Sequence, residues 1–341
     1  MSGGVGARTG RATSLDVARL AGVNQSTVSR ALRDDPRVAA GTRARVLAAA
    51  RELGYTPDAI ARSLITRRTD LVAIVMAGLA SPFQPYVLDK FIRELGAAGM
   101  RPLVFSAPQG REVDDILPAA LAYRPDALIV TSATLSSGRV AECARHGTPV
   151  ILFNRTLPGS AASAVCCDNA EGGRLVADLL IDAGHQRLAY IAGSANSSTN
   201  RDRERGFADR LRERGSARFR REQAAYTYEA GYAAARALLA RDDPPDAVFC
   251  ASDIIALGVR DIARELGIRV PEELALVGFD DIPMAGWAAY DLTTIRQPVD
   301  RMIAATLALL REPAKSPETH LFPGELVVRG STRGIPRRPL P

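Results

Sequence analysis

The chain has 341 residues, a length that predicts two or three domains rather than one. Apolar residues make up 47% of it and charged residues 24%, an ordinary globular composition, and no apolar run approaches the ~20 residues that cross a bilayer. Its four cysteines and three histidines lack the short paired spacing of a metal site, so we expect no metal, no cofactor and no membrane association.

The excess of positive charge lies in the first fifth of the chain. The whole chain carries a net charge of +6, and residues 1–70, with 12 Arg and 6 acidic residues, account for all of it. Nucleic-acid binding needs basic groups concentrated on one part of a molecule, which makes this segment the candidate region. The alternative is a solvated basic tail, but the helical patterns described next argue against a tail.

Residues 14–53 contain three short helical patterns. Ser14 is a candidate N-cap for the first helix, whose apolar residues repeat at steps of three and four until Gly22 ends it. Asn24 is the candidate N-cap of a second helix, and a third is predicted over about 42–53. The tight turn between the first two helices is typical of a helix-turn-helix, whose second helix enters the major groove.

The outward side chains of the second helix have the chemistry that reads DNA. Arg30 can form a bidentate pair with guanine and Gln25 can read adenine, while hydroxyl groups can contact bases or phosphates. The alternative is a plain three-helix bundle with a polar surface. The predicted DNA-contacting residues of this helix are Asn24, Gln25, Ser26, Thr27, Ser29 and Arg30.

A short helix capped by Asp58 is predicted over 59–64, next to the polar run 66–69. It is too short to be stable alone. From its pattern alone the segment is interpreted as a linker in which Leu64 packs on the core.

From Leu71 onward, short apolar runs alternate with amphipathic helical patterns. This alternation predicts parallel sheets covered by helices on both faces, and the number of units indicates two doubly wound lobes. We expect strands at 71–75, 103–105, 127–130, 150–153, 188–192, 247–250 and 274–278, and helices at 86–97 and 114–122.

Ligands of such sheets bind beyond the carboxyl ends of the strands. The alternatives are a loop cap for Asp280 and a surface ion pair with Glu204 or Asp202 for Arg203. Trp287, the single tryptophan, is expected to pack between the lobes. The polar or aromatic residues that follow the strands, and that converge if the lobes face one another, are Phe83, Gln84, Asn154, Arg203, Ser252 and Asp280.

The termini are expected to be disordered over 1–13 and 331–341. The first of these segments has no apolar stretch of the secretory kind, so we expect a cytoplasmic protein. No heptad tract predicts an added tetramer-forming helix, which favours a homodimer.

Several segments together resemble LacI/GalR-type transcriptional regulators. The stretch 15–32 (LDVARLAGVNQSTVSRAL) is similar to the signature of that family, as is its continuation 42–57. Family-like segments of the remaining domain are 149–155, 168–173, 203–207, 251–258 and 277–281.

The resemblance implies a helix-turn-helix domain over 14–57, a hinge over 58–69 and a periplasmic-binding-protein-like (type I) core of two doubly wound lobes over 70–330. It implies that Leu64 is wedged into the minor groove, where apolar side chains unstack a base step. It also implies that Arg203 and Asp280 bind an effector, because an arginine and a carboxylate together bind hydroxyl groups well.

The chain departs from the family pattern at three positions. Ser252 stands where asparagine is usual, Gln84 where an aromatic residue is frequent, and Asp58 where many members have asparagine. The first two are expected ligand contacts, so the effector need not be one of the familiar sugars.

We therefore expect a ligand-responsive regulator that binds a near-palindromic double-stranded operator as a homodimer, on the nucleoid, and responds to a sugar or sugar derivative. An enzyme on this scaffold would need a glycine-rich phosphate loop, a Gly-x-Ser-x-Gly elbow or a histidine paired with a nucleophile, and the sequence lacks all three. The other alternative is a soluble sugar-binding protein of the same core fold without a regulatory role, against which the basic N-terminal segment argues.

Overall fold

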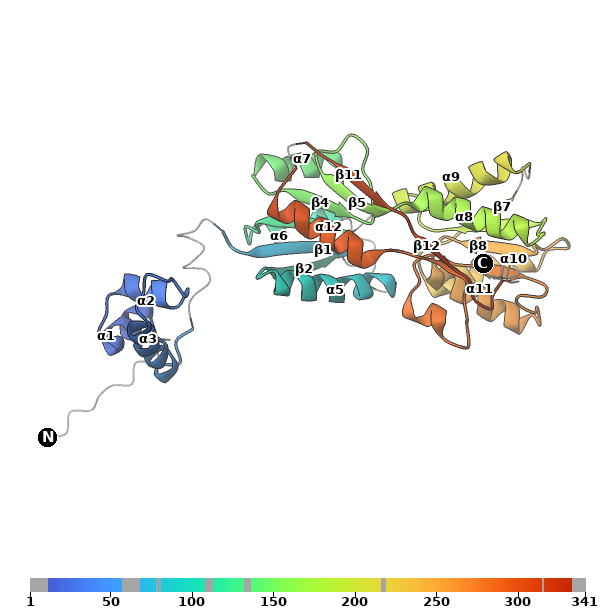
Figure 1. The fold of residues 1–341 in the computed structure, drawn as a ribbon. Coiled ribbons are helices and arrows are strands. Elements are labelled where there is room, and N and C mark those ends of the chain that lie inside the picture. The colour runs from blue at the N-terminus through green and yellow to red at the C-terminus, as the bar shows by residue number, and fades with distance from the viewer. Residues whose placement is uncertain are drawn as a thin grey trace, which may run out of the picture. The chain divides into compact units, whose positions relative to one another are not determined.

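The structure is a computed structural model that describes residues 12–56, 68–77, 79, 81–107, 113–131, 136–215, 219–314 and 316–332. The chain divides into two compact units, Met1–Thr69 and Asp70–Pro341 (Figure 1). Within the described part of the chain, no helix is both long enough and apolar enough to cross a membrane. The predicted linker helix over 59–64, with Leu64, lies outside the described residues.

The N-terminal unit consists of three helices, α1 (Ser14–Ala21), α2 (Gln25–Ala31) and α3 (Ala40–Glu52). Their apolar faces meet in a small core of buried alanine and valine side chains, with Tyr55 packed against it. Helices this short are not stable alone, so this packing holds them together.

The caps of these helices agree with the sequence at two positions and differ at one. Gly22 ends α1 in the left-handed conformation, and the Asn24 side chain caps α2 by accepting the backbone N–H of Thr27, as predicted. The cap of α1 is Thr13, not Ser14: Thr13 and Asp16 form a reciprocal capping box. Because Thr13 is an ordered cap, the predicted disordered arm cannot extend to residue 13.

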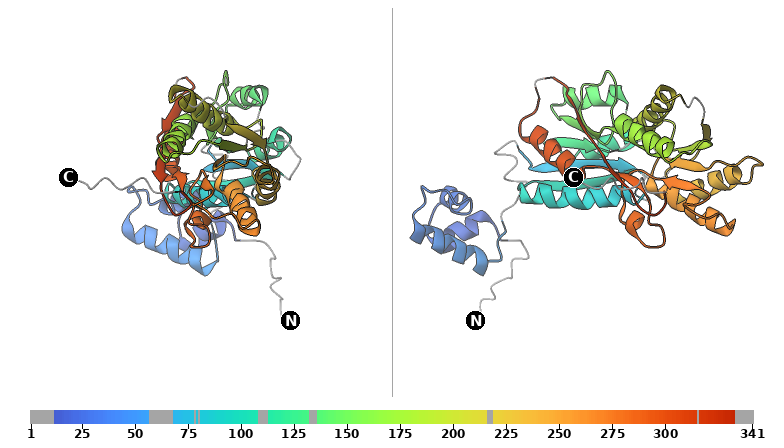
Figure 2. Two further views of the ribbon diagram at one scale, coloured as in Figure 1. Left: turned by 90° about the vertical axis from the view of Figure 1, so that its right-hand side faces the viewer. Right: turned by 45° about the vertical axis from the view of Figure 1, so that its right-hand side comes forward.

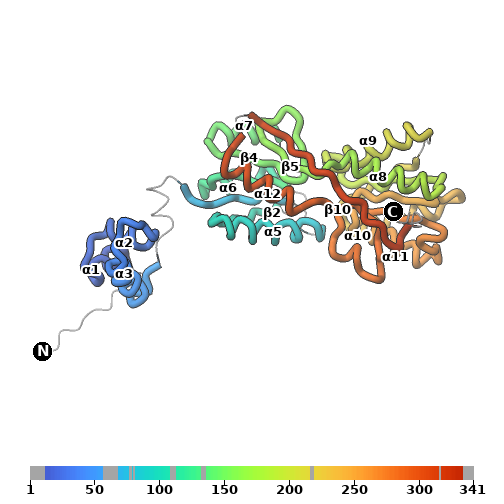
Figure 3. Tube along the Cα trace, in the orientation of Figure 1, coloured from blue at the N-terminus to red at the C-terminus, as the bar shows by residue number. Residues whose placement is uncertain are grey.

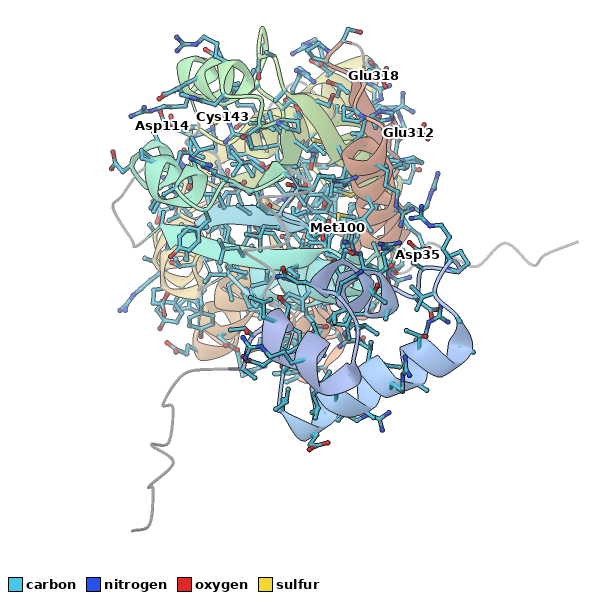
Figure 4. The ribbon with its side chains drawn as sticks, turned by 90° about the vertical axis from the view of Figure 1, so that its left-hand side faces the viewer. Asp35, Met100, Asp114, Cys143, Glu312 and Glu318 are labelled. Carbon is cyan, nitrogen blue, oxygen red and sulfur yellow. The ribbon has the colours of Figure 1, made fainter. Side chains whose placement is uncertain are left out.

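The first lobe of the C-terminal unit is a parallel six-stranded sheet in the order β11-β5-β4-β3-β1-β2. Helices α5 and α12 pack on one face and α6 and α7 on the other. Asp114 of α6 and Cys143 of α7 mark the latter pair in Figure 4. The strands are β1 (Leu71–Ala77), β2 (Arg101–Ala107), β3 (Ala127–Val130), β4 (Val150–Phe153), β5 (Ser163–Cys167) and β11 (Thr319–Phe322), and the helices are α5 (Phe83–Ala97), α6 (Val113–Leu121), α7 (Ser137–Arg145) and α12 (Val299–Arg311).

The second lobe is a parallel four-stranded sheet in the order β7-β6-β8-β9. Helices α8 and α9 lie together on one side of it and α10 and α11 on the other (Figures 1 and 2). The strands are β6 (Leu188–Ala192), β7 (Arg220–Gln223), β8 (Ala247–Cys250) and β9 (Ala275–Val277), and the helices are α8 (Asn169–Asp182), α9 (Ser198–Glu213), α10 (Tyr228–Leu239) and α11 (Asp253–Glu265), followed by the 3-10 helix η1 (Pro283–Gly286).

The chain passes between the two lobes three times in its described part. It crosses after β5, again between β10 (Thr294–Arg296) and α12, and a third time between β11 and β12 (Glu325–Val327). The course of the chain can be followed in Figure 3. Strands β10 and β12 pair antiparallel beside these crossings. Strand β5 ends where the chain crosses into the second lobe, so the carboxyl ends of the parallel strands of the first sheet face the junction. In the second lobe, α8 runs away from the junction and β6 returns toward it, so the carboxyl ends of that sheet face the junction as well.

The predicted fold class, two doubly wound lobes after a helix-turn-helix, is confirmed. In each sheet the strand order reverses, between β1 and β3 in the first lobe and between β6 and β8 in the second. Such reversals are the positions where parallel sheets leave room for a ligand.

Two expectations outside the sheets are wrong. Trp287 does not pack between the lobes, because 56% of it is exposed beside η1. The predicted disordered tail does not begin at 331, since the buried Ser331 donates its hydroxyl to the carbonyl of Leu276 at 2.6 Å.

Candidate DNA-binding surface and effector site

Helix α2 presents one polar face to solvent. Gln25, Ser26 and Arg30 are exposed, while Val28 and Ala31 on the opposite face are buried in the core of the N-terminal unit. The helix therefore offers an amide, a hydroxyl and a guanidinium from one surface, the set of groups that reads base edges.

Two of the predicted DNA contacts have local structural roles. The Asn24 carboxamide oxygen accepts the backbone N–H of Thr27 at 2.8 Å and its hydroxyl at 2.7 Å. Ser26 also donates to this oxygen, at 2.8 Å. Asn24 and Thr27 thus fix the start of α2, and contacts of their remaining polar atoms with DNA stay a prediction.

The exposed readers are held by neighbours. Gln25 Nε2 donates to Ser14 Oγ of α1 at 2.8 Å, and Arg30 Nη2 donates to Ser26 Oγ at 3.1 Å. Ser29 accepts a hydrogen bond from Arg33 one turn later. These weak, exposed contacts orient the side chains without removing them from solvent.

In the C-terminal unit, Arg203 of α9 is the centre of the candidate effector site. Its side chain is only 2% exposed. Nε donates to Asn169 Oδ1 at 2.8 Å, Nη2 pairs with Asp280 Oδ1 at 3.2 Å, and Nη1 donates to the carbonyl of Ala251. The guanidinium also lies 3.6 Å from the ring centre of Phe279.

These contacts exclude one of the alternatives for Arg203. The surface ion pair considered from the sequence does not form, because Glu204 pairs with Arg221 and Asp202 pairs with Arg205. Arg203 instead forms the buried pair with Asp280, 77 residues away.

Asp280 follows β9 and is buried at the junction. Its Oδ1 also accepts a hydrogen bond from Gln297 Nε2 at 2.7 Å. Burial raises the pKa of its carboxyl group, and the Arg203 charge and the Gln297 hydrogen bond act in the opposite direction. Asp280 and Asn154 both have positive φ, at 116° and 55°, a backbone strain that often accompanies binding sites.

The close contact of α8 with α9 brings Asn169 and Arg203 together. A Cβ on Gly206 would lie 1.9 Å from the carbonyl oxygen of Ala170, and one on Gly173 would lie 2.2 Å from that of Arg203. Only glycine at these two positions lets the helix backbones touch.

Three buried polar atoms of the site have no hydrogen-bond partner among the described residues. They are Asn154 Oδ1, Ser252 Oγ and Gln297 Oε1. Buried polar atoms are nearly always paired in native proteins, so unpaired ones at one junction indicate where a ligand's polar groups bind. Asn154 follows β4, and Ser252 follows β8 at the point where the second sheet reverses.

In the first lobe, Gln84 contacts the residue that follows β3, and Phe83 lies in the core. Thr131, which directly follows β3, donates its hydroxyl to Gln84 Oε1 at 3.1 Å. Phe83 is 5% exposed and belongs to the same core cluster as Phe91 and Phe153. Its contact with a ligand stays a prediction.

The two lobes touch beside the site. The backbone N–H of Thr156, after β4, donates to Ser198 Oγ at the start of α9 at 3.0 Å. A cavity of about 100 Å³ lies next to this contact and is lined in part by Cys166, Asn169 and Asp202. The described residues contain no group of His, Cys, Asp and Glu side chains suited to a metal ion.

The sequence analysis missed Gln297, Asn169 and Thr131. Thr131 could have been found, because it follows a predicted strand directly. Gln297 begins one crossing between the lobes, and Asn169 follows another. A crossing has no apolar periodicity, so the sequence pattern marks neither residue. The remaining predicted DNA contact, Leu64, lies outside the described residues.

The fold and the sites define a helix-turn-helix protein with a small-molecule-binding core. Residues 13–58 match the sequence pattern of the family of bacterial regulatory proteins, lacI family. Residues 177–332 match the pattern of a periplasmic binding protein-like domain. The first match includes the whole of α2, and the second includes Arg203, Asp280 and Gln297 of the candidate effector site.

Whole-length relatives agree with these matches. The chain is 34% identical to the HTH-type transcriptional regulator reg1 of Streptomyces lividans, over 94% of this chain and 96% of the relative. It is 31% identical to the HTH-type transcriptional repressor CytR of Escherichia coli, over 95% and 97%.

Solved structures are also similar along nearly the whole chain. A crystal structure of the Lac repressor dimer bound to operator and the anti-inducer ONPF superposes with a TM-score of 0.85, at 25% identity, over 95% of this chain and all of that one. A complex of the transcriptional regulator CelR with cellobiose gives 0.69, at 31% identity, over 94% and 100%. The chain belongs to the lacI family of bacterial regulatory proteins and is a DNA-binding transcriptional regulator.

Proposed function

We propose that this regulator binds a near-palindromic operator as a homodimer and changes its affinity for DNA when a sugar-like effector binds between the lobes of the C-terminal unit. Arg203 and Asp280, with the unpaired Asn154, Ser252 and Gln297, carry the proposal for the effector. The dimer and the operator are supported by the Lac repressor dimer–operator structure, and the sugar by the CelR–cellobiose complex.

The polar groups of the site suit an effector with several hydroxyl groups. Asn154 Oδ1 and Gln297 Oε1 are acceptors that need a donor, and Asp280 adds a carboxylate between Arg203 and Gln297. A sugar presents alternating donors and acceptors on adjacent carbons, which is the complement of this set. We propose the same role for Gln84 and Phe83 in the first lobe.

For DNA we propose that Gln25, Ser26, Ser29 and Arg30 contact bases and phosphates, with Asn24 and Thr27 contributing where α2 begins. We further propose a DNA-binding domain over 14–57, a hinge over 58–69 and an effector domain over 70–330. We propose that the protein regulates by binding and not by catalysis. We also propose that it acts at the nucleoid in the cytoplasm.

Closure of the lobes couples the two sites in this proposal. An effector that contacts both lobes favours the closed arrangement by its differential affinity, and the difference is transmitted to DNA binding. The hydrogen bond from Thr156 to Ser198 joins the two lobes.

The experiment that tests the function is genome-wide binding of the purified full-length protein, with sequencing of the bound fragments. A sharp palindromic motif beside an operon for transport or catabolism supports the proposal and nominates effectors. Diffuse binding that disappears with salt, as expected of a generic basic arm, contradicts it.

The effector site is tested by Asp280→Asn. The substitution removes the carboxylate but keeps the size of the side chain, so the response to effector should be lost. Because Arg203 loses its buried counter-ion, operator binding is compared at a temperature where circular dichroism shows the variant to be folded, and there it should be retained. Retained induction by the nominated effector would remove Asp280 from the site.

A further inference from the structure

Asp281 follows Asp280 on the loop after β9, and the function proposed above does not use it. Its carboxylate lies between two arginines. Oδ1 accepts a hydrogen bond from Arg329 Nη2 at 2.6 Å, and Oδ2 accepts one from Arg296 Nε at 2.7 Å. The Asp281 side chain is only 10% exposed, so these charge-assisted bonds are less screened than the exposed ion pairs of the same lobe.

The two arginines belong to the two segments that carry the second and third crossings between the lobes. Arg296 is the last residue of β10, directly before the second crossing, and Arg329 follows β12, where the third crossing ends. Arg296 also lies opposite Glu325 in the pairing of β10 with β12, and their side chains form an ion pair at 3.0 Å. The Asp281 carboxylate therefore binds the second-lobe ends of both crossings.

On its other side the loop is held by α11. The backbone N–H of Ile282 donates to Asp253 Oδ2 at 2.8 Å, and the backbone N–H of Asp253 donates to the carbonyl of Phe279 at 2.8 Å. Residues 279–282 are thus attached to α11 at both ends, and Asp281 attaches their middle to the crossings.

The position of Asp280 depends on these attachments. Asp280 and Asp281 have φ values of 116° and 53°, which residues other than glycine keep only where the surrounding structure holds the backbone. The backbone N–H of Asp280 donates to the carbonyl of Ile295 at 2.9 Å, and Gln297 donates to its carboxylate at 2.7 Å. Neighbouring residues of the second crossing therefore hold neighbouring residues of the loop.

The crossings are the covalent joints between the lobes, so any change in the arrangement of the lobes bends them. We infer that Asp281 is the positioning residue that couples effector binding to the movement of the lobes, because it fastens the loop of Asp280 to two of the crossings. The inference rests on the proposed function, since it concerns how that effector site controls DNA binding. Without Asp281, an effector at Asp280 would move the loop alone, and the crossings would not follow.

The first test measures hydrogen exchange of backbone amides in the ligand-free, full-length protein. Arg329→Met removes one ion pair on the crossing side and should speed exchange in the loop 279–282 at least about tenfold, the amount typical of a hydrogen bond to a charged group. In the background of Asp281→Asn the same substitution should add almost nothing, because the connection is already broken. Equal acceleration in both backgrounds, or none in either, would overturn the inference.

The second test measures the response to a sugar. Cellobiose, D-galactose, D-ribose and D-gluconate are screened by thermal unfolding, and operator affinity is measured by fluorescence anisotropy with and without a saturating concentration of the sugar that binds. Allosteric coupling typically changes affinity by about 5–150-fold, and in Asp281→Asn the ratio of the two affinities should fall to within about twofold of one.

Saturation separates coupling from affinity, because weaker binding of the sugar no longer affects the ratio. A purely structural role would lower stability and leave the ratio as in the wild type, which would overturn the inference. If Asp281→Asn does not fold, Arg296→Met takes its place. It removes only the half-exposed arginine and should reduce the ratio at least about threefold; an unchanged ratio would again overturn the inference.

The matched control is Asp243→Asn. The Asp243 carboxylate also lies between two arginines, at 3.3 Å from Arg187 and 2.7 Å from Arg220, but it precedes β8, at the end of the sheet away from the junction. It should leave loop exchange and the affinity ratio unchanged, and the same loss in both variants would refute a specific role for Asp281. Failure of the proposed function is a separate result: no sugar then alters operator binding by the wild type, and the exchange comparison alone decides on Asp281.

Discussion

The polar side chains of α2 and those between the two lobes of the C-terminal unit lie in opposite environments. On α2, Gln25, Ser26 and Arg30 are exposed and their side chains hydrogen-bond within the small unit. At the lobe junction, Arg203 and Asp280 are almost wholly buried, next to Gln297, whose Oε1 has no hydrogen-bond partner among the residues that the structure describes.

The difference reflects the size of what each surface is expected to bind. DNA covers a whole face of the unit, so the side chains that contact it can remain hydrated until DNA binds. Their exposure therefore costs the free protein little stability. A small effector gains affinity only if the protein encloses it and fixes the contacting groups beforehand. Substitutions at the junction should therefore affect stability, and substitutions on α2 should affect recognition.

The largest effect is expected for Arg203→Met. It leaves the Asp280 carboxylate buried without its cation and should cost about 3–5 kcal/mol of unfolding free energy. Urea denaturation followed by circular dichroism measures this cost. The double variant Arg203→Met with Asp280→Asn removes both charges and should recover much of the loss; a double variant as unstable as the single one would show that the ion pair is not the cause.

The contact of α8 with α9 should be nearly as sensitive. Gly206→Ala places a methyl group against the backbone of Ala170 and should cost about 1–3 kcal/mol or more, because the helices must separate. Gly96→Ala in α5 is the control, since a Cβ there meets no atom within 4 Å. Thermal unfolding should show a loss for the first variant and no loss for the second; equal behaviour would mean that α8 and α9 tolerate separation.

On α2 the expected effect is on specificity. Arg30→Ala should cost about 1–3 kcal/mol of binding to the selected operator and relax the base preference at one position, with little change in unfolding. Fluorescence anisotropy with the operator and with random DNA measures both affinities. An equal loss on random DNA would assign Arg30 to phosphate contact.

The smallest effect is expected at the cap of α1. Thr13→Ala breaks the capping box with Asp16 and should cost about 1 kcal/mol, seen as faster hydrogen exchange of the amides at the start of α1. Thr13→Ser keeps the hydroxyl and should restore protection. Unchanged exchange in Thr13→Ala would leave packing alone to define the start of this helix.

The strands predicted from the sequence are those with continuous apolar runs. Strands β3, β4, β6 and β8 have the predicted bounds, because each is buried on both faces. Five strands were missed: β7 is the charged edge strand RREQ, β10, β11 and β12 have only three or four residues, and β5 is a short stretch of mostly small residues, SAVCC. Their positions depend on neighbouring strands, which a local pattern does not contain.

The sequence predicted the effector-site residues that follow the carboxyl end of a strand, because ligands of parallel sheets bind there. That rule finds Asn154, Ser252 and Asp280, which follow β4, β8 and β9. It cannot find the partner of Arg203, because the pairing with Asp280 spans 77 residues of chain.

The three crossings between lobes determine how this regulator can be recombined with its relatives. The N-terminal unit is one continuous stretch, so a chimera can exchange it with a single joint near residue 69. The second lobe is assembled from about 168–297 and 325–332, on either side of α12 and β11, which belong to the first lobe. Operator preference can thus be transplanted as one cassette, whereas grafting a foreign second lobe requires two insertions and three spliced junctions that must keep the same geometry.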